Sequence, residues 1–275
     1  ALAIGLTAAG VSLTACSSTA SAPGTIDVSS GADACALSAT EAPSGNITFS
    51  VKNTGTEVTE FYLLGEDQLR IVGEVENIGP GLSRDLVLQA TPGSYYTACK
   101  PGMVGDGIRA PFTITDSGTG VSAVPVSAEL NTATGQYAAY VRDQTSQLLV
   151  DTKAFAAAYK AGDDDAARAA YADTRMHWER IEPVAEAFGD LDPKLDLREA
   201  DLEPGQEWTG WHRIEKDLWP PAKYKAMTQA QRDKIADQLV ADTQVLYNRT
   251  RTIKFTPAEL GNGAKELLDE VATGR

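Results

Sequence analysis

Two short segments of the sequence carry side chains whose types and spacing suit metal coordination. Glu179 and Glu182 are three residues apart in a stretch of helical periodicity, so they lie about 60° apart around the helix and share a face. His212 and Glu215 have the same spacing in the second segment. A Glu/His pair on one helix facing carboxylates on another is how helical bundles hold metal ions. We therefore predict that the two segments build one metal site.

Each pair by itself also fits an ordinary solvated helix face. Their joint occurrence in an acidic chain with only two histidines favours the metal site. The other histidine, His177, lies about 200° around the helix from Glu179, so we expect it to point elsewhere and to act as a packing or solvent-facing residue.

The charge balance excludes one class of partner and favours another. The chain of 275 residues has 24 Lys and Arg against 38 Asp and Glu, a formal net charge of −14. Such a surface disfavours phosphate backbones, so we expect no nucleic-acid binding. It favours cations, metals or basic protein patches. A hydrophobic content of 43% indicates a packed core.

The proposed ligands require helices to position them, and residues 126–275 have the pattern of an all-α bundle. We predict helices over residues 128–161, from a cap at Asp163 or Asp164 to about residue 188, over 206–219 and 228–253, and from Pro257 onward. Residues 189–197 read as a loop.

Residues 33–117 have a different pattern, with period-two alternation interrupted by Gly and Pro turns, which predicts an all-β sandwich. This part contains two cysteines, Cys35 and Cys99. Two cysteines in one small domain of an exported protein most often form a disulfide, which we therefore expect here. The alternative is a second metal site of thiolates and carboxylates. Its carboxylates would come from Glu74 and Glu76, which alternate on one strand and so share a face.

The start of the chain resembles a processing signal. Residues 1–15 are small and apolar but too short to span a bilayer, as in part of a secretory signal. Leu13-Thr-Ala-Cys16 resembles a bacterial lipobox, which implies lipid on Cys16; an ordinary signal with a chance cysteine is the alternative. Residues 16–32 read as a flexible tether. We expect an exported lipoprotein, anchored on the outer face of the cytoplasmic membrane or in the periplasm.

The β-rich part resembles the cupredoxin family. The resemblance lies in residues 45–55 and in the run Pro92-Gly-Ser-Tyr-Tyr-Thr-Ala-Cys99, since a cysteine at the end of the late strand ligates copper in that family. Met103 follows shortly after. A blue-copper site also needs two histidines, and neither histidine of this chain precedes residue 177. The sequence thus excludes type 1 copper and leaves copper of another kind open.

The helical part resembles the imelysin family, whose peptidase class is M75. Gly210-Trp-His-Arg-Ile-Glu215 looks like its Gly-x-His-x-x-Glu signature, and residues 178–199 with 207–219 are similar to the EfeO-type iron-uptake lipoproteins, which pair a cupredoxin-like domain with an imelysin domain. The resemblance covers residues 35–275. The ligand set that it implies is Glu179, Glu182, Asp196, His212 and Glu215. Such chains usually continue for several helices, so we expect the bundle to be incomplete.

The resemblance implies a function in iron uptake. It implies that iron, as Fe²⁺ or Fe³⁺, is captured outside the cell and delivered to a membrane iron permease, with a haem peroxidase as a further partner. Oxygen ligands with one imidazole suit iron, and they also suit Zn or Mn. A structural zinc site would prefer Cys and His.

Two other function classes remain alternatives. A metal-dependent peptidase of the zincin type needs His-Glu-x-x-His, but Trp211 and Arg213 flank His212, so the general base is missing and we expect no enzyme activity. A polysaccharide- or surface-binding module could use Trp208, Trp211 and Trp219 as a stacking platform. Tryptophans at those spacings are more often part of a bundle core.

Overall fold

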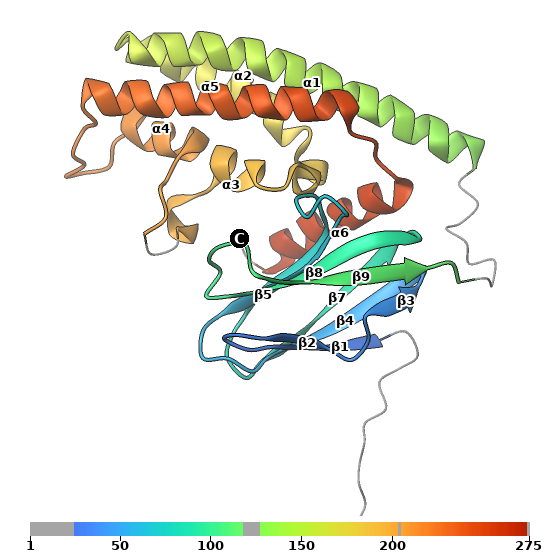
Figure 1. Cartoon of the computed structure of the whole chain (residues 1–275). Coiled ribbons are helices and arrows are strands. Elements are labelled where there is room, and N and C mark those ends of the chain that lie inside the picture. Colours follow the sequence, from blue (N-terminus) through green and yellow to red (C-terminus); the bar gives the residue numbers. More distant parts are fainter. Residues whose placement is uncertain (1–24, 118–126, 203–204, 274–275) are drawn as a thin grey trace, which may run out of the picture.

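The computed structural model describes residues 25–117, 127–202 and 205–273, which form a β-sandwich followed by a helical region (Figure 1). The predicted signal segment and the lipidation site Cys16 lie outside the described residues. No helix in the described part of the chain combines the length and the hydrophobicity that crossing a bilayer requires.

The predicted sandwich is confirmed by the strand pairing. One sheet has the order β2-β1-β4-β7 and the other β3-β9-β8-β5-β6. The inner faces enclose a core in which the ring of Phe49 contacts those of Phe61 and Phe112. The strands are β1 (Thr25–Ser30), β2 (Cys35–Leu37), β3 (Glu41–Pro43), β4 (Gly45–Asn53), β5 (Thr59–Leu64), β6 (Ile71–Ile78), β7 (Ser83–Ala90), β8 (Gly93–Pro101) and β9 (Ile108–Thr115).

The prediction of a tether up to residue 32 is wrong for its second half. Residues 25–30 form β1, which pairs in parallel with β4 and antiparallel with β2. Ile26, Val28 and Ser30 are buried, whereas Asp27 is exposed. This alternation is the pattern of a half-buried strand, and the Ser-rich composition around it obscured the signal.

The helical region contains six α-helices and two 3₁₀ segments within the described residues. Several helices begin at side-chain caps, and Thr228 and Gln231 form a reciprocal capping box before α5. The helices are α1 (Ala128–Lys160), α2 (Asp164–Glu179), α3 (Leu191–Asp196), α4 (Gly210–Leu218), α5 (Gln229–Thr252) and α6 (Pro257–Thr273), and the 3₁₀ segments are η1 (Glu182–Phe188) and η2 (Glu199–Asp201).

Two predicted helix boundaries and one predicted loop differ from the structure, and each difference affects the site. The second helix ends at Glu179 instead of continuing to residue 188, and η1 follows it. Pro183 accounts for this end, because it has no N–H to donate to the carbonyl of Glu179 four residues earlier and its ring would clash with that carbonyl in a continued helix. Residues 191–196 of the expected loop form α3, and α4 begins at Gly210 rather than at residue 206.

The helical region folds back onto the sandwich through α6 (Figure 1). The amide nitrogen of Asn262 donates to the carbonyl oxygens of Val72 and Gln89, and the amide oxygen of Asn262 accepts from the backbone of Gln89. Arg70 on the sandwich forms an ion pair with Glu259. These contacts set the outer face of the five-stranded sheet opposite η1 and α3.

Candidate metal centre

Three helices bring a cluster of ionisable side chains together around Arg175. From α2, Arg175 donates from both terminal nitrogens to the carboxylate of Asp196 at the end of α3, and it also donates to Glu179 one turn further along α2. Its side chain is 11% exposed and that of Asp196 is 12% exposed. The guanidinium therefore lies at the centre of a largely buried ion-pair network.

His212 on α4 presents one ring nitrogen to this network. Its Nδ1 atom lies 2.6 Å from Oε2 of Glu215. A carboxylate can only accept a hydrogen bond, so Nδ1 carries the proton and the lone pair of a neutral imidazole resides on Nε2. Nε2 lies 3.5 Å from Oδ1 of Asp196, and Nη1 of Arg175 is also 3.5 Å from it. Glu215 thus orients a potential nitrogen ligand toward Asp196.

A close contact between α3 and α4 fixes the distance between Asp196 and His212. Gly210 has a φ of +80°, and a Cβ atom there would lie 2.2 Å from the carbonyl oxygen of Leu195. The hydroxyl of Thr209 donates to the carbonyl of Lys194 at 2.9 Å. Only glycine permits both the backbone conformation and this close approach.

Two effects act in opposite directions on the pKa of Arg175, namely its burial and the charges of its partners. Burial lowers the pKa, whereas the hydrogen bond and charge of Asp196, followed by weaker contributions of Tyr171 and Glu179, raise it further, so the net pKa lies above the ordinary value. Arg175 therefore stays charged, and the network contains a permanent cation.

A cavity of about 430 Å³ extends from Asp196 between the helical region and the sandwich. It is lined by nine carboxylates and three cationic side chains, so its field favours positive ions. Burial, and then the charges of Glu74 and Glu60, raise the pKa of the Tyr62 phenol well above its ordinary value. The carboxylates are Glu60, Glu74, Glu76, Asp106, Glu182, Asp190, Asp192, Asp196 and Asp201.

The comparison with known families decides the identity of the helical region. The family model described as Peptidase_M75: Imelysin matches residues 133–275. The chain belongs to the imelysin family.

Related proteins share more than the imelysin domain. The iron uptake system component EfeO of Escherichia coli O1:K1 / APEC is 37% identical over 234 residues, which are 84% of this chain and 60% of the relative. The component of the same name from Shigella flexneri is 36% identical over the same shares. The predicted resemblance to EfeO-type proteins is thus confirmed. The chain spans about 60% of the length of these relatives.

Solved structures that resemble part of the chain include an auracyanin and a multi-copper oxidase. Reduced auracyanin from Roseiflexus castenholzii is 23% identical and covers 34% of this chain and 97% of its own, with a TM-score of 0.28. A multi-copper oxidase from Pediococcus acidilactici is 20% identical and covers 34% of this chain and 25% of its own, with a TM-score of 0.24.

The imelysin region brings four of the five predicted ligands together. Glu179, Asp196, His212 and Glu215 all belong to the network around Arg175. Glu182 instead lines the cavity. The spacing argument for Glu179 and Glu182 assumed one continuous helix, which the structure contradicts, since α2 ends at Glu179. Within the described residues, no group of three or more His, Cys, Asp or Glu side chains is already arranged to hold a metal ion.

Arg175 is the member of the site that sequence reasoning missed. Its spacing of four residues from Glu179 on a helix was the only signal available. That spacing predicts a surface ion pair and gives no indication of the contact with Asp196, which comes from α3.

The second histidine of the imelysin region points away from the cluster, as the helical spacing indicated. His177 Nδ1 lies 2.9 Å from the amide oxygen of Gln144, and Nε2 lies 3.2 Å from a carboxylate oxygen of Asp151. Both partners are on α1. His177 therefore has a structural role between α1 and α2.

The stacking platform that the alternative interpretation assigned to three tryptophans is not formed. Trp211 is fully buried and packs against Phe155 and Tyr171 in the core of the imelysin region. Trp219 is 47% exposed, and Trp208 lies under the cationic groups of Arg213 and Lys216. The three rings lack a common exposed surface because Trp211 faces the core side of α4.

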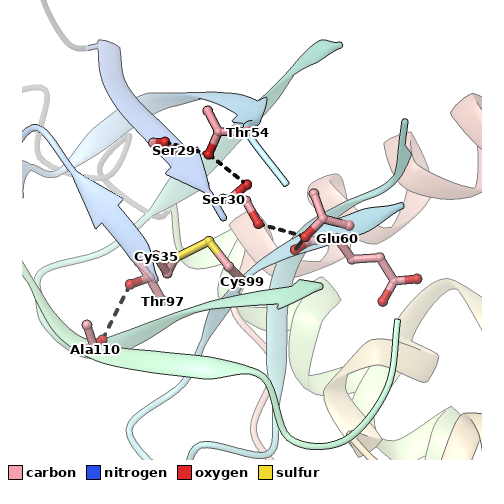
Figure 2. Close-up of a disulfide and its surroundings, with 9 residues drawn as sticks. Ser29, Ser30, Cys35, Thr54, Glu60, Thr97, Cys99 and Ala110 are labelled. Atoms are coloured by element: carbon pink, nitrogen blue, oxygen red, sulfur yellow. Dashed lines mark hydrogen bonds between the residues drawn. A yellow bond between two sulfur atoms is a disulfide. The ribbon is translucent and has the colours of Figure 1, made fainter. Parts of the chain in front are cut away.

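The suggested thiolate and carboxylate site in the sandwich is contradicted by the strand register. Cys35 and Cys99 form a disulfide (Figure 2). Cys99 is opposite Phe61 and belongs to the inner core. Tyr62 follows Phe61 on β5, and Glu74 of β6 is opposite Tyr62. Both Glu74 and Glu76 line the cavity outside the sheet. Because neighbouring residues of a strand point to opposite faces, the sulfurs and these carboxylates lie on different sides of the sheet.

Proposed function

We propose that this chain binds iron outside the cytoplasm and passes it on for uptake, without chemical turnover. The observation that carries the proposal is the arrangement of His212, whose Nε2 lone pair is directed at Asp196 by the hydrogen bond from Nδ1 to Glu215. Histidines that bind metals commonly donate their other ring nitrogen to a carboxylate in this way. The relatives named as components of an iron uptake system support iron as the cargo.

The five residues predicted as ligands take different roles in this proposal. Asp196 and His212 supply the central oxygen and nitrogen donors, and Glu179 adds a carboxylate that is 43% exposed. Glu215 orients His212 through its hydrogen bond to Nδ1 and adds a carboxylate next to the site. Glu182 belongs to the approach, where the acidic cavity concentrates cations near Asp196.

The donor set defines the cations that fit. Carboxylate oxygens with one imidazole suit Fe²⁺ or Fe³⁺, and Zn or Mn fit the same donors. We treat the metal as cargo, because a protein that transports an ion must also release it.

The wider pathway is part of the same proposal. We infer delivery to a membrane iron permease, a haem peroxidase as a further partner, and attachment to the membrane by lipid on Cys16. The naming of the relatives as parts of an uptake system supports the existence of partners, and the lipobox sequence supports the anchor.

The two histidines provide a matched test. We expect His212→Gln to weaken the binding of Zn²⁺, and of Fe²⁺ without oxygen, by at least about a hundredfold in isothermal titration calorimetry, because a direct ligand is lost. His177→Gln removes a histidine from the same helical core but should keep the wild-type affinity. Equal affinities of wild type and His212→Gln would refute the proposed site.

A further inference from the structure

The cluster of predicted ligands surrounds a cationic side chain of the protein itself, that of Arg175. Its two terminal nitrogens donate to Asp196, one of them also donates to Glu179, and the other lies 3.5 Å from Nε2 of His212. These are the atoms that the proposed function assigns to the metal. The same lone pairs cannot serve the guanidinium and a metal ion together.

Distances make the two occupants mutually exclusive. A metal bound to Asp196 and His212 would lie about 2.0–2.2 Å from each donor atom. The donor atoms Oδ1 of Asp196 and Nε2 of His212 are 3.5 Å apart, and Nη1 of Arg175 already contacts both of them. A metal between these donors would therefore lie against a guanidinium that stays positively charged at physiological pH, because it does not give up its proton.

We propose that Arg175 is a displaceable internal cation, which occupies the ligand set of the metal-free protein and leaves it when a metal ion binds. This inference rests on the proposed function, since it concerns the same site. The guanidinium has a way out, because its partner Glu179 lies at the exposed end of α2, with a side chain that is 43% exposed. We therefore expect displacement to occur by rotation of the Arg175 side chain toward this exposed end.

Such a residue would serve both states of a transport protein. Without metal, it neutralises carboxylates that would otherwise repel one another at a largely buried position. With metal, it competes for the ligands, lowers the affinity and provides a cation that can return as the cargo leaves. A site built only for tight retention would gain from the absence of this arginine.

The test replaces Arg175 by a neutral residue of similar shape. We expect Arg175→Gln to bind Zn²⁺, and Fe²⁺ without oxygen, at least about tenfold more tightly than wild type, because no internal cation has to be displaced. Metal release to a chelator, followed by stopped flow, should slow by a similar factor. The metal-free variant should also unfold at a lower urea concentration than wild type, and added metal should restore its midpoint.

Two further variants make the result specific. Arg168→Gln removes another arginine of α2, one that donates to the carbonyl of Leu218 and not to the cluster, and it should keep the wild-type affinity. Arg175→Lys retains a cation but loses the two-nitrogen contact with Asp196, so it should bind metal more tightly than wild type and less tightly than Arg175→Gln. It provides a second measurement if the glutamine variant does not fold, and an affinity equal to or below that of wild type would also overturn the inference.

The outcomes separate this inference from the proposed function. If wild type binds metal and Arg175→Gln binds equally or more weakly, Arg175 supports the ligands instead of competing with the metal, and the inference is overturned. If wild type itself fails to bind either metal, the proposed function falls, and this inference falls with it.

Discussion

Gly210 offers the sharpest test of how the fold positions the proposed metal ligands. It begins α4 two residues before His212, and it touches the backbone of α3 one residue before Asp196. A Cβ atom at Gly210 would lie 2.2 Å from the carbonyl oxygen of Leu195 and 2.7 Å from that of Lys194. Both obstacles are backbone atoms, which cannot move aside by changing rotamer.

The expected cost of Gly210→Ala has two parts. A φ of +80° is unfavourable for alanine by about 1–2 kcal/mol. Relieving the contact with Leu195 requires α3 and α4 to separate by roughly 1 Å, because carbon and oxygen atoms pack at about 3.5 Å, and overpacking of this kind costs about 1–3 kcal/mol. We therefore expect the variant to lose about 2–5 kcal/mol of unfolding free energy.

Gly162→Ala provides the matched control. Gly162 has a φ of +76°, and a Cβ atom there would meet nothing within 4 Å. This variant should therefore lose only the backbone part, about 1–2 kcal/mol. The difference between the two variants in urea denaturation measures the contact between α3 and α4 alone.

The functional consequence follows from the same displacement. Separating α3 from α4 moves Asp196 away from His212, and metal sites tolerate only about 0.5 Å of such error. We expect Gly210→Ala to bind Zn²⁺ at least about tenfold more weakly than wild type in calorimetry, whereas Gly162→Ala should bind normally. Equal stability of the two variants, or unchanged affinity of Gly210→Ala, would refute the reasoning.

Three further predictions concern other parts of the molecule. Glu215→Ala removes the group that orients His212, so calorimetry should show zinc affinity lower by about 10–100-fold; Glu199→Gln, an exposed carboxylate paired with a lysine of α4, should change nothing, and equal effects of the two would contradict the orienting role. Replacing Cys35 and Cys99 by alanine opens a link across 64 residues and should lower the unfolding free energy by about 4 kcal/mol in urea; a change too small to resolve would count against the disulfide. Burial raises the pKa of Asp217, but hydrogen bonds from the Met227 backbone and then Tyr159 and Tyr224 outweigh it and leave the pKa below its ordinary value. The stabilisation of the fold by ionised Asp217 is therefore complete above a pH of about 4 and disappears as the pH falls through the lowered pKa. Asp217→Asn should accordingly destabilise the protein by about 1–3 kcal/mol at pH 7 and by less at pH 3 in urea titrations. A loss of stability that is the same at both pH values would contradict this origin.

The sequence by itself determined the division into a β-sandwich and a helical region, because periodicity is a local property. The change from period two to helical spacing falls between the described sandwich and α1. The predicted cap at Asp163 or Asp164 and the predicted helix from residue 228 lie within one residue of the starts of α2 and α5. The residue types of the site were also readable, since His212 and Glu215 share a face on any helix of that register. Likewise, a sandwich without histidine excludes type 1 copper whatever its exact shape.

Only the tertiary structure decided which charged groups meet. The pairing of Phe61 with Cys99, and of Tyr62 with Glu74, depends on the register between separate strands, and it places sulfurs and carboxylates on opposite sides of one sheet. The meeting of Arg175 with Asp196 depends on how α2 and α3 pack, which no spacing along the chain encodes. Local patterns specify elements and faces, whereas contacts between distant elements follow from how those faces are buried against one another. For this reason the sequence and its family resemblance predicted a set of metal ligands, whereas the contact of Arg175 with that set became visible only in the folded chain.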